Sequence, residues 1–178
     1  MEATHSSHST TPGSVLLSSG GVGRNIAEAA HRILSKETSP QTPVLVSLVG
    51  EDIVGGVLRE ELSRMGIRTD GLISAPARAS AVCNMVLDAE GGLITGVADM
   101  DIIESLEGET ASPPSTPLQS TVLNTASIQV IEQLERHNPN LVAIDGNLKV
   151  SATTDIVLHC NRHRKAGIIR PTTSSWWS

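Results

Sequence analysis

The chain has 178 residues, of which 39% are hydrophobic and 18% charged, with a formal net charge of −6 at pH 7. This length suffices for one domain with its own core, and the acidic balance argues against nucleic acid or an anionic membrane as partner, because both need a basic surface. No apolar run approaches the ~20 residues that span a bilayer, and the first 14 residues lack the basic and apolar regions of a secretory signal.

The first part of the chain is predicted to alternate strands and helices. Residues 1–13 are rich in Ser, Thr and His and are expected to be disordered. Ser14–Ser18 is a short strand candidate, and the apolar residues of Val22–Leu34 follow helical spacing. Val44–Val49 is a continuous apolar run, typical of a strand buried on both faces.

A second helix and a hairpin are predicted next. Ile53–Met65 has helical spacing, with Gly66 as its C-terminal cap. Ala79–Leu87 and Leu93–Ala98 flank the turn sequence DAEGG, which predicts a β-hairpin. Residues 107–120 are rich in Pro, Ser and Thr and are expected to form a loop.

The last part of the chain returns to helix and strand. A helix is expected over Thr125–Arg136, ended by Asn138-Pro139. Leu141–Asp145 is a second buried-strand candidate, and Ser151–Ala166 a helix with Ser151 as N-cap and Gly167 as its stop. This order predicts an α/β fold: a mostly parallel sheet with helices on both faces and a projecting β-hairpin lid.

The glycine-rich run Gly20-Gly21-Val22-Gly23-Arg24-Asn25 is a candidate ligand site. It is not a P-loop, because Gly-Lys-Ser/Thr is absent, and it lacks the third glycine of the dinucleotide fingerprint. Missing side chains let a ligand approach the backbone, and free N–H groups at a helix start can donate to it. Asn25 adds a donor and an acceptor, which suits a sugar hydroxyl. A tight turn with close helix–sheet packing explains the pattern about equally well.

Asp145-Gly146-Asn147 follows the second buried strand. Ligands of open α/β sheets lie outside the carboxyl ends of the strands, so Asn147 is a candidate substrate contact. The favoured interpretation from the residues alone is an Asp-Gly turn that leaves the strand.

Three carboxylates in DMDIIE could hold a divalent metal, but a helix cap with acids in the first turn is the favoured explanation. They are Asp99, Asp101 and Glu104.

His159 and His163 lie four residues apart on a predicted helix and share a face. Cys160 stands where zinc hydrolases carry Glu, and no third ligand is evident, so an ordinary solvated helix face is favoured and no metal site is predicted. The only other cysteine, Cys83, is interpreted as a packed, inert thiol. Two distant cysteines make no disulfide framework, which indicates a reducing, cytoplasmic setting.

Four stretches together resemble the PfkB (ribokinase-like) carbohydrate kinases. SSGGVGRNIAEAAHRI resembles the GGxGxN signature and its helix, and LVSLVGEDIVGGVLREELSRMGIRTDGL resembles the VGxDxxGxxL block. SAPARASAVCNMVLDAEGGLITGVADMDI resembles the lid strands, and LVAIDGNLK the strand that ends in Asp/Asn. Within the family, the sequence is most similar to the kinase half of fungal bifunctional pseudouridine-metabolising proteins. In those proteins a pseudouridine-5′-phosphate glycosidase domain precedes the kinase domain.

The resemblance implies a Rossmann-like kinase that transfers the γ-phosphoryl group of ATP, with Mg²⁺, to a hydroxyl of a sugar or nucleoside. The residues that would contact substrate hydroxyls are Gly20, Gly21, Gly23, Asn25 and Asn147. The partial kinase domain would span residues 14–170, with the lid hairpin at about 72–98, and residues 171–178 would form an irregular tail.

The second family signature, a D-x-x-G-A-G-D-like motif that supplies the anion hole and the catalytic Asp, is absent from the 178 residues. No catalytic residue is therefore assigned, and a truncated ribokinase-like fold that binds substrate without phosphorylating it is expected. The ending IIRPTTSSWWS, which holds both Trp residues of a chain without Phe or Tyr, favours a shortened gene product. The alternatives are a non-catalytic sugar- or nucleoside-binding module, and a non-functional gene fragment that does not fold stably.

Overall fold

The computed structural model describes residues 12–37, 41–106 and 128–170. The disorder expected up to residue 11, the loop at 107–120 and the tail at 171–178 lie outside these described residues. Within them, no helix is both long and apolar enough to cross a bilayer.

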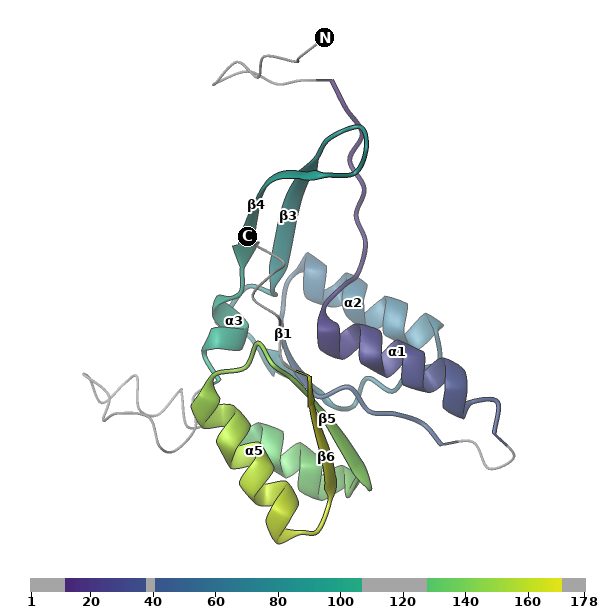
Figure 1. Ribbon diagram of the computed structural model, residues 1–178, viewed down its shortest axis with the longest axis vertical. Helices are drawn as coiled ribbons and strands as arrows, with labels where there is room; N and C mark the ends of the chain where they lie inside the picture. Colours follow the sequence, from purple (N-terminus) through teal and green to yellow (C-terminus); the bar gives the residue numbers. More distant parts are fainter. Residues whose placement is uncertain (1–11, 38–40, 107–127, 171–178) are drawn as a thin grey trace, which may run out of the picture.

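Helices and strands alternate along the chain, interrupted by one hairpin (Figure 1). The elements are α1 (Val22–Leu34), β1 (Ser47–Gly50), α2 (Ile53–Arg64), β2 (Leu72–Ala75), β3 (Val82–Leu87), β4 (Leu93–Asp99), α3 (Asp101–Glu104), β5 (Leu141–Asp145), α5 (Val150–Arg162) and β6 (Ala166–Arg170). Residues 128–137 are also helical.

The strands pair two by two. β1 pairs with β2 in parallel, with Ser47 opposite Leu72, and β5 pairs with β6 in parallel, with Leu141 opposite Ala166. β3 and β4 form the antiparallel hairpin. The α/β class predicted from the sequence is confirmed, and the parallel strands of the described chain stand in two pairs rather than in one continuous ladder.

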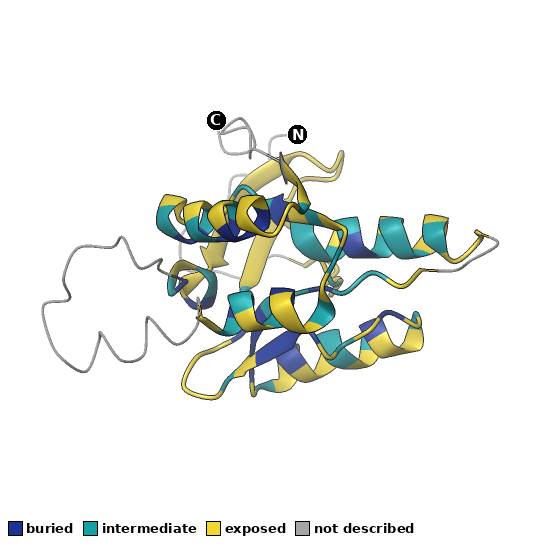
Figure 2. Cartoon of the chain, turned by 90° about the horizontal axis from the view of Figure 1, so that it is seen from below, coloured by how far each residue is buried: buried dark blue, intermediate teal, exposed yellow. Residues whose placement is uncertain are grey.

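The two faces of the β1–β2 pair carry different core clusters, because successive side chains of a strand point to opposite faces. Val49 faces a cluster with α1 and α2 that includes the fully buried Leu62. Leu48 faces a larger cluster with α3, the helical residues 128–137, β5 and α5, which includes Ile102 and Ile156. Helices therefore cover both faces, as predicted (Figure 2).

The β3–β4 hairpin projects from this body, and every residue of its strands is exposed (Figures 1 and 2). The carboxylate of Asp88 shapes its turn by accepting the N–H groups of Glu90 and Gly92, at 3.1 and 2.6 Å. Cys83 is exposed here, so the expectation of a packed thiol is wrong, because a two-stranded ribbon has no buried side.

The strand expected at Ser14–Ser18 does not form. Val15, Leu16 and Leu17 lie in irregular chain and are 101, 90 and 81% exposed. A strand needs a neighbouring strand for its N–H and C=O groups, and no such pairing of this segment occurs within the described chain. The strand prediction is therefore wrong, because it was based on the apolar composition of the segment, and this segment has no pairing partner in the described chain.

The helix stops predicted at Gly66 and Gly167 had different outcomes. Gly66 ends α2 as predicted, with φ +77°, its N–H bonded to the Ser63 carbonyl and that of Ile67 to the Leu62 carbonyl.

Helix α5 differs from its prediction at both ends. It begins after Lys149, so the N-cap role predicted for Ser151 is wrong. It ends at Arg162, because Arg164 adopts φ +53° and the Lys165 N–H bonds the Cys160 carbonyl at 2.8 Å. Gly167 lies inside β6 and is not the stop.

Candidate functional site

The glycine-rich turn leads directly into α1. Gly21 is the N-cap residue with φ +97°, a conformation that favours glycine, and no side chain caps the helix there. The first N–H that bonds within the helix is that of Asn25, to the Gly21 carbonyl at 2.9 Å. The preceding N–H groups, of Val22, Gly23 and Arg24, have no carbonyl one turn earlier in the helix to bond. The turn therefore presents backbone donors without a side chain in front of them.

The space around these glycines separates the two explanations left open by the sequence. A Cβ built at Gly20 or Gly21 would meet no atom within 4 Å, and one at Gly23 would lie 3.6 Å from Leu45 Cδ1, an ordinary contact. Close helix–sheet packing therefore does not explain the glycines. Turn geometry explains Gly21 alone.

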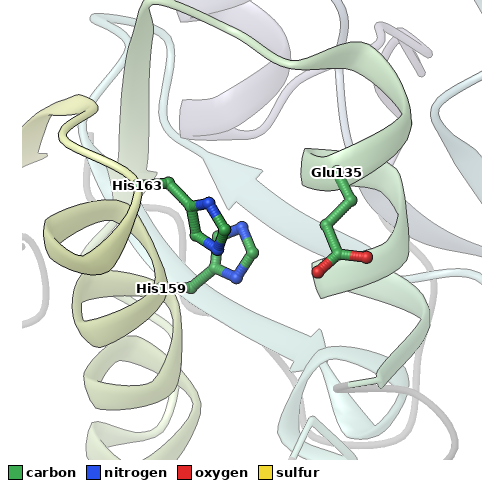
Figure 3. A group of neighbouring side chains, drawn as sticks. All are labelled: Glu135, His159 and His163. Carbon is green, nitrogen blue, oxygen red and sulfur yellow. The ribbon is translucent and has the colours of Figure 1, made fainter.

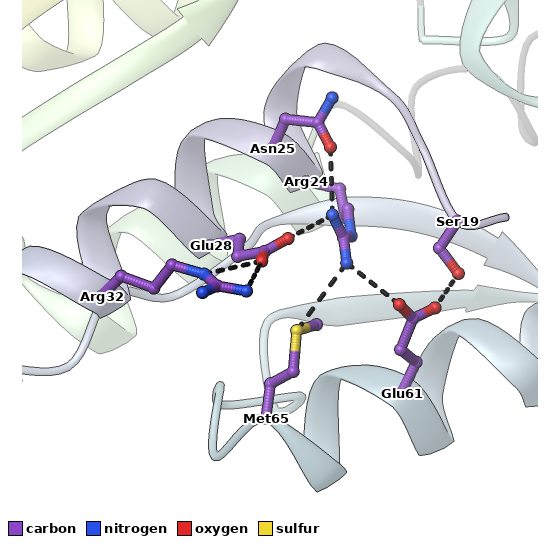
Figure 4. Close-up of polar contacts among 7 residues, drawn as sticks. All are labelled: Ser19, Arg24, Asn25, Glu28, Arg32, Glu61 and Met65. Carbon is purple, nitrogen blue, oxygen red and sulfur yellow. Dashed lines mark hydrogen bonds and ion pairs between the residues drawn. The ribbon is translucent and has the colours of Figure 1, made fainter.

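An ion-pair network fixes α1 against α2 beside the turn (Figure 4). The Arg24 side chain, 12% exposed, pairs with Glu28 and Glu61, and it also donates to Asn25 Oδ1 at 3.1 Å. Ser19 donates to Glu61, which anchors the chain just before Gly20. The network thus holds both ends of the glycine turn, and Figure 4 shows the exposed Asn25 side chain with its amide nitrogen pointing away from the network.

The same ion-pair network changes the pKa of the Glu28 carboxyl group. The hydrogen bond from Arg32, together with the charges of Arg24 and Arg32, lowers the pKa of Glu28 below its ordinary value. Glu28 therefore stays ionised and keeps both arginines in place.

A second cluster joins the β1–α2 turn to the chain that enters the hairpin. Asp52 caps α2 by accepting the Gly55 N–H at 2.8 Å, and it accepts the N–H and hydroxyl of Ser80, both at 2.7 Å. The buried Ser80 hydroxyl in turn accepts the Gly50 N–H at 3.0 Å. These hydrogen bonds, that from Gly55 first, lower the pKa of Asp52. We call these four residues the Asp52 cluster.

Two glycines of the Asp52 cluster are required by packing. A Cβ at Gly50 would lie 2.5 Å from the Arg78 carbonyl oxygen, and a Cβ at Gly55 would lie 2.3 Å from the Gly50 carbonyl oxygen. The resemblance to the VGxDxxGxxL block covers this VGEDIVG stretch, but it implies no role for Asp52. The signal that identifies it is an Asp immediately before a helical apolar pattern, the usual sign of an N-cap.

Asn147 lies in the turn after β5 and is exposed. Its N–H donates to the Asp145 carboxylate at 3.0 Å. This contact agrees with the Asp-Gly turn that the sequence analysis favoured for this segment. Helix α1 contacts β5, so the glycine turn and Asn147 belong to neighbouring elements. The Asn147 side chain is exposed beyond the carboxyl end of its strand, where ligands of α/β sheets bind.

The carboxylates of DMDIIE serve the local backbone. Asp99 accepts the Asp101 N–H at 3.4 Å, and Asp101 and Glu104 lie in the single turn of α3. This arrangement agrees with the capping explanation, although Met100 rather than an acid is the N-cap residue.

Comparison with known proteins gives a consistent result, although no protein-family model matches the chain. It is 25% identical over 124 residues to the pseudouridine kinase of Escherichia coli (strain K12), covering 70% of this chain and 38% of that protein. It is 34% identical over 101 residues to the pseudouridine kinase of Arabidopsis thaliana, covering 56% of this chain and 24% of that protein. Among solved structures, a putative sugar kinase from Clostridium perfringens superposes with a TM-score of 0.64 at 21% identity, covering 96% of this chain and 46% of that chain.

The fold is therefore that of the ribokinase-like carbohydrate kinases. The sequence relatives carry the names pseudouridine kinase and sugar kinase, and they confirm the resemblance to PfkB-like carbohydrate kinases. The chain spans about a quarter to two fifths of the length of these curated relatives.

Proposed function

We propose that this chain is the substrate-binding part of an ATP-dependent sugar or nucleoside kinase, with a pseudouridine-like nucleoside as substrate. The backbone at Gly20, Gly21 and Gly23 approaches the sugar, and the side chains of Asn25 and Asn147 bond its hydroxyls. The open space over Gly20 and Gly21 is the observation that carries this proposal, because neither packing nor turn geometry accounts for a glycine at position 20.

The chemistry of the turn suits a polyol. Sugar hydroxyls both donate and accept hydrogen bonds, so they pair with the backbone N–H donors at the start of α1 and with the Asn25 amide. A hydroxyl needs no compensating charge. The Arg24 guanidinium is already paired with Glu28 and Glu61, so it is not available as a phosphate ligand.

The exposed hairpin is the proposed lid. It is attached to the body through Ser80, two residues before β3, so the Asp52 cluster fixes the base about which it closes. Closure over the sugar would exclude water, which otherwise competes with the substrate hydroxyl as phosphoryl acceptor.

The resemblance implies ATP and Mg²⁺ for the whole kinase, but the described residues do not fit an ATP phosphate chain. The start of α2 is filled by the Asp52 carboxylate, whose negative charge repels phosphate. We therefore propose that these 178 residues bind the nucleoside without transferring phosphate, and we assign no step to ATP.

Calorimetric titration of the purified chain with pseudouridine, uridine and ribose tests the proposal. Gly20→Ala is expected to weaken nucleoside binding at least ~10-fold without lowering the melting temperature, because its methyl group enters open space. Gly13→Ala is the matched control, since its methyl group also enters open space away from α1. Asn25→Ala is expected to weaken binding as well, and Asn140→Ala, a change at another exposed asparagine, is not.

Two results would overturn the assignment. If the Gly20→Ala and Gly13→Ala variants bind the nucleoside with equal affinity, the glycine turn is not the binding site. Transfer of phosphate from ATP to pseudouridine by the 178-residue chain would refute the binding-only role while leaving the substrate class intact.

A further inference from the structure

Three metal-ligating side chains meet between α5 and the helical residues 128–137. His159 lies on α5 and His163 is the C-cap residue of that helix, with their ring centroids 4.4 Å apart, and Glu135 comes from the facing helix. One ligand atom from each of the three lies within 4.8 Å of the others. Figure 3 shows the Glu135 carboxylate directed toward the two imidazole rings.

We propose that Glu135, His159 and His163 bind a divalent transition-metal ion, with Zn²⁺ the best-matched candidate. Two imidazoles and one carboxylate form a set that suits zinc and its neighbours rather than Mg²⁺ or Ca²⁺, which prefer oxygen ligands. The sequence spacing identified the histidine pair. The fold brings Glu135 close to this pair as a third ligand, which the spacing did not indicate.

The surroundings leave these ligand atoms available. The site borders a pocket of about 220 Å³ whose lining also includes Val142 and Cys160. In the described part of the chain, no hydrogen bond occupies the ring nitrogens of the two histidines or the Glu135 carboxylate. The His159 side chain is only 8% exposed but lines the pocket, through which an ion can reach its ring.

The geometry requires a small adjustment that the site allows. Tetrahedral Zn²⁺ with bonds of about 2.0–2.1 Å holds its ligand atoms about 3.3 Å apart, closer than the 4.8 Å limit found here. Glu135 and His163 are exposed, so rotation about their side-chain bonds can close the gap around the buried His159. Three protein ligands leave the fourth position to water from the pocket.

Cys160 lies beside the site but is not assigned to it. The group of ligand atoms that lie within 4.8 Å of one another comprises Glu135, His159 and His163 and does not include the Cys160 sulfur. A thiolate ligand has a distinct spectroscopic signature, so the assignment of this residue can be checked directly.

The ion would join two elements of the larger core. Residues 128–137 and α5 both pack around Ile144 of β5, through Leu134 and Ile156 among others. An ion that bridges Glu135 to the two histidines binds only the folded arrangement, so it must stabilise the fold by mass action. The glycine turn is not part of this site, and the test below does not depend on nucleoside binding.

The experiment is a metal titration of the chelator-treated 178-residue chain, followed by calorimetry and thermal unfolding. Zn²⁺ at 100 times its dissociation constant is expected to raise the melting temperature by about 5–10 °C. Glu135→Gln and His163→Gln are expected to weaken Zn²⁺ binding at least ~10-fold while the metal-free melting temperature stays near that of the parent chain. Glu132→Gln, an exposed acid on the same helix, and His31→Gln on α1 are the controls and should bind Zn²⁺ as the parent chain does.

Co²⁺ substitution reports the ligand set. Visible absorption typical of four-coordinate Co²⁺, lost in His163→Gln, supports the site. Failure of the parent chain to bind Zn²⁺, unchanged affinity in both ligand variants, or a Co²⁺–thiolate charge-transfer band that disappears in Cys160→Ala would each overturn the proposed ligand set.

Discussion

Replacing Gly55 by Ala, and separately its neighbour Gly56 by Ala, tests whether packing fixes the Asp52 cluster. Both glycines lie in the first turns of α2, so both changes bring the same gain in helix propensity, about 0.5–1 kcal/mol. They differ in their surroundings. Gly55 is buried, whereas a Cβ at Gly56 would meet no atom within 4 Å.

The expected magnitudes follow from the contacts. A methyl group at Gly55 would lie 2.3 Å from the Gly50 carbonyl oxygen, 2.7 Å from Val49 Cγ1 and 2.9 Å from Ser80 Oγ. The backbone of α2 must therefore move away from β1, and overpacking of this kind costs about 1–3 kcal/mol. Displacement of the Ser80 hydroxyl weakens two further hydrogen bonds, each contributing about 0.5–1.5 kcal/mol. We expect a net loss of about 1–3 kcal/mol for Gly55→Ala and a gain of about 0.5–1 kcal/mol for Gly56→Ala.

Thermal unfolding followed by circular dichroism separates the two variants. For a chain of this size, about 2–4 °C of melting temperature corresponds to 1 kcal/mol. Gly55→Ala should therefore melt about 2–12 °C below the parent chain, and Gly56→Ala about 1–4 °C above it. Equal upward shifts in both variants would refute the close approach of α2 to β1.

Three further perturbations probe the core and the two polar clusters. Leu62→Ala removes a side chain with 0% exposure and should lower the free energy of unfolding in urea by about 2–5 kcal/mol, and a loss below about 1 kcal/mol would contradict its place in the core. Asp52→Asn should destabilise the chain at pH 7, and its gap from the parent should close as the pH falls below about 4. A carboxyl with a lowered folded-state pKa stabilises the fold above the unfolded-state pKa of about 3.9 and loses that contribution as the pH falls through the folded value, so a gap that is independent of pH would count against the cluster. A double-mutant cycle of Arg24→Met with Glu61→Gln should give a coupling of about 0.5–1.5 kcal/mol, and additive single effects would show that the pair does not join α1 to α2.

The sequence allows prediction of features that repeat or that act locally. Periodicity identified α1 and α2, and the turn DAEGG identified the β3–β4 hairpin, because these signals lie within one element or between adjacent ones. The strand at Leu141–Asp145 was predicted within the same bounds that the structure shows. β2 and β6 were not predicted, since each forms by pairing with a strand elsewhere in the chain.

Long-range contacts set the limit of prediction. Ser80 bonds Asp52 from 28 residues away, and Glu135 reaches two histidines on a different helix. Nothing in the local spacing of these residues indicates the contact. The failed strand at Ser14–Ser18 has the same cause: its apolar residues satisfy the local pattern, but strand formation depends on a partner that the local pattern does not specify.

The glycines divide into two groups, and the division bears on where a ligand binds. At Gly50, Gly55 and Gly71 an added Cβ would lie within 2.6 Å of another atom, so the fold itself requires glycine. Gly20 has open space and needs no positive φ, but open space alone does not define a site, since Gly56 in the first turns of α2 is equally open. Position 20 differs because it precedes a helix start whose backbone donors lack both a side-chain cap and a carbonyl within the helix. A methyl group at Gly56 would face only solvent, whereas one at Gly20 would precede those donors, and this difference is why we propose that the substrate hydroxyls bind at the start of α1.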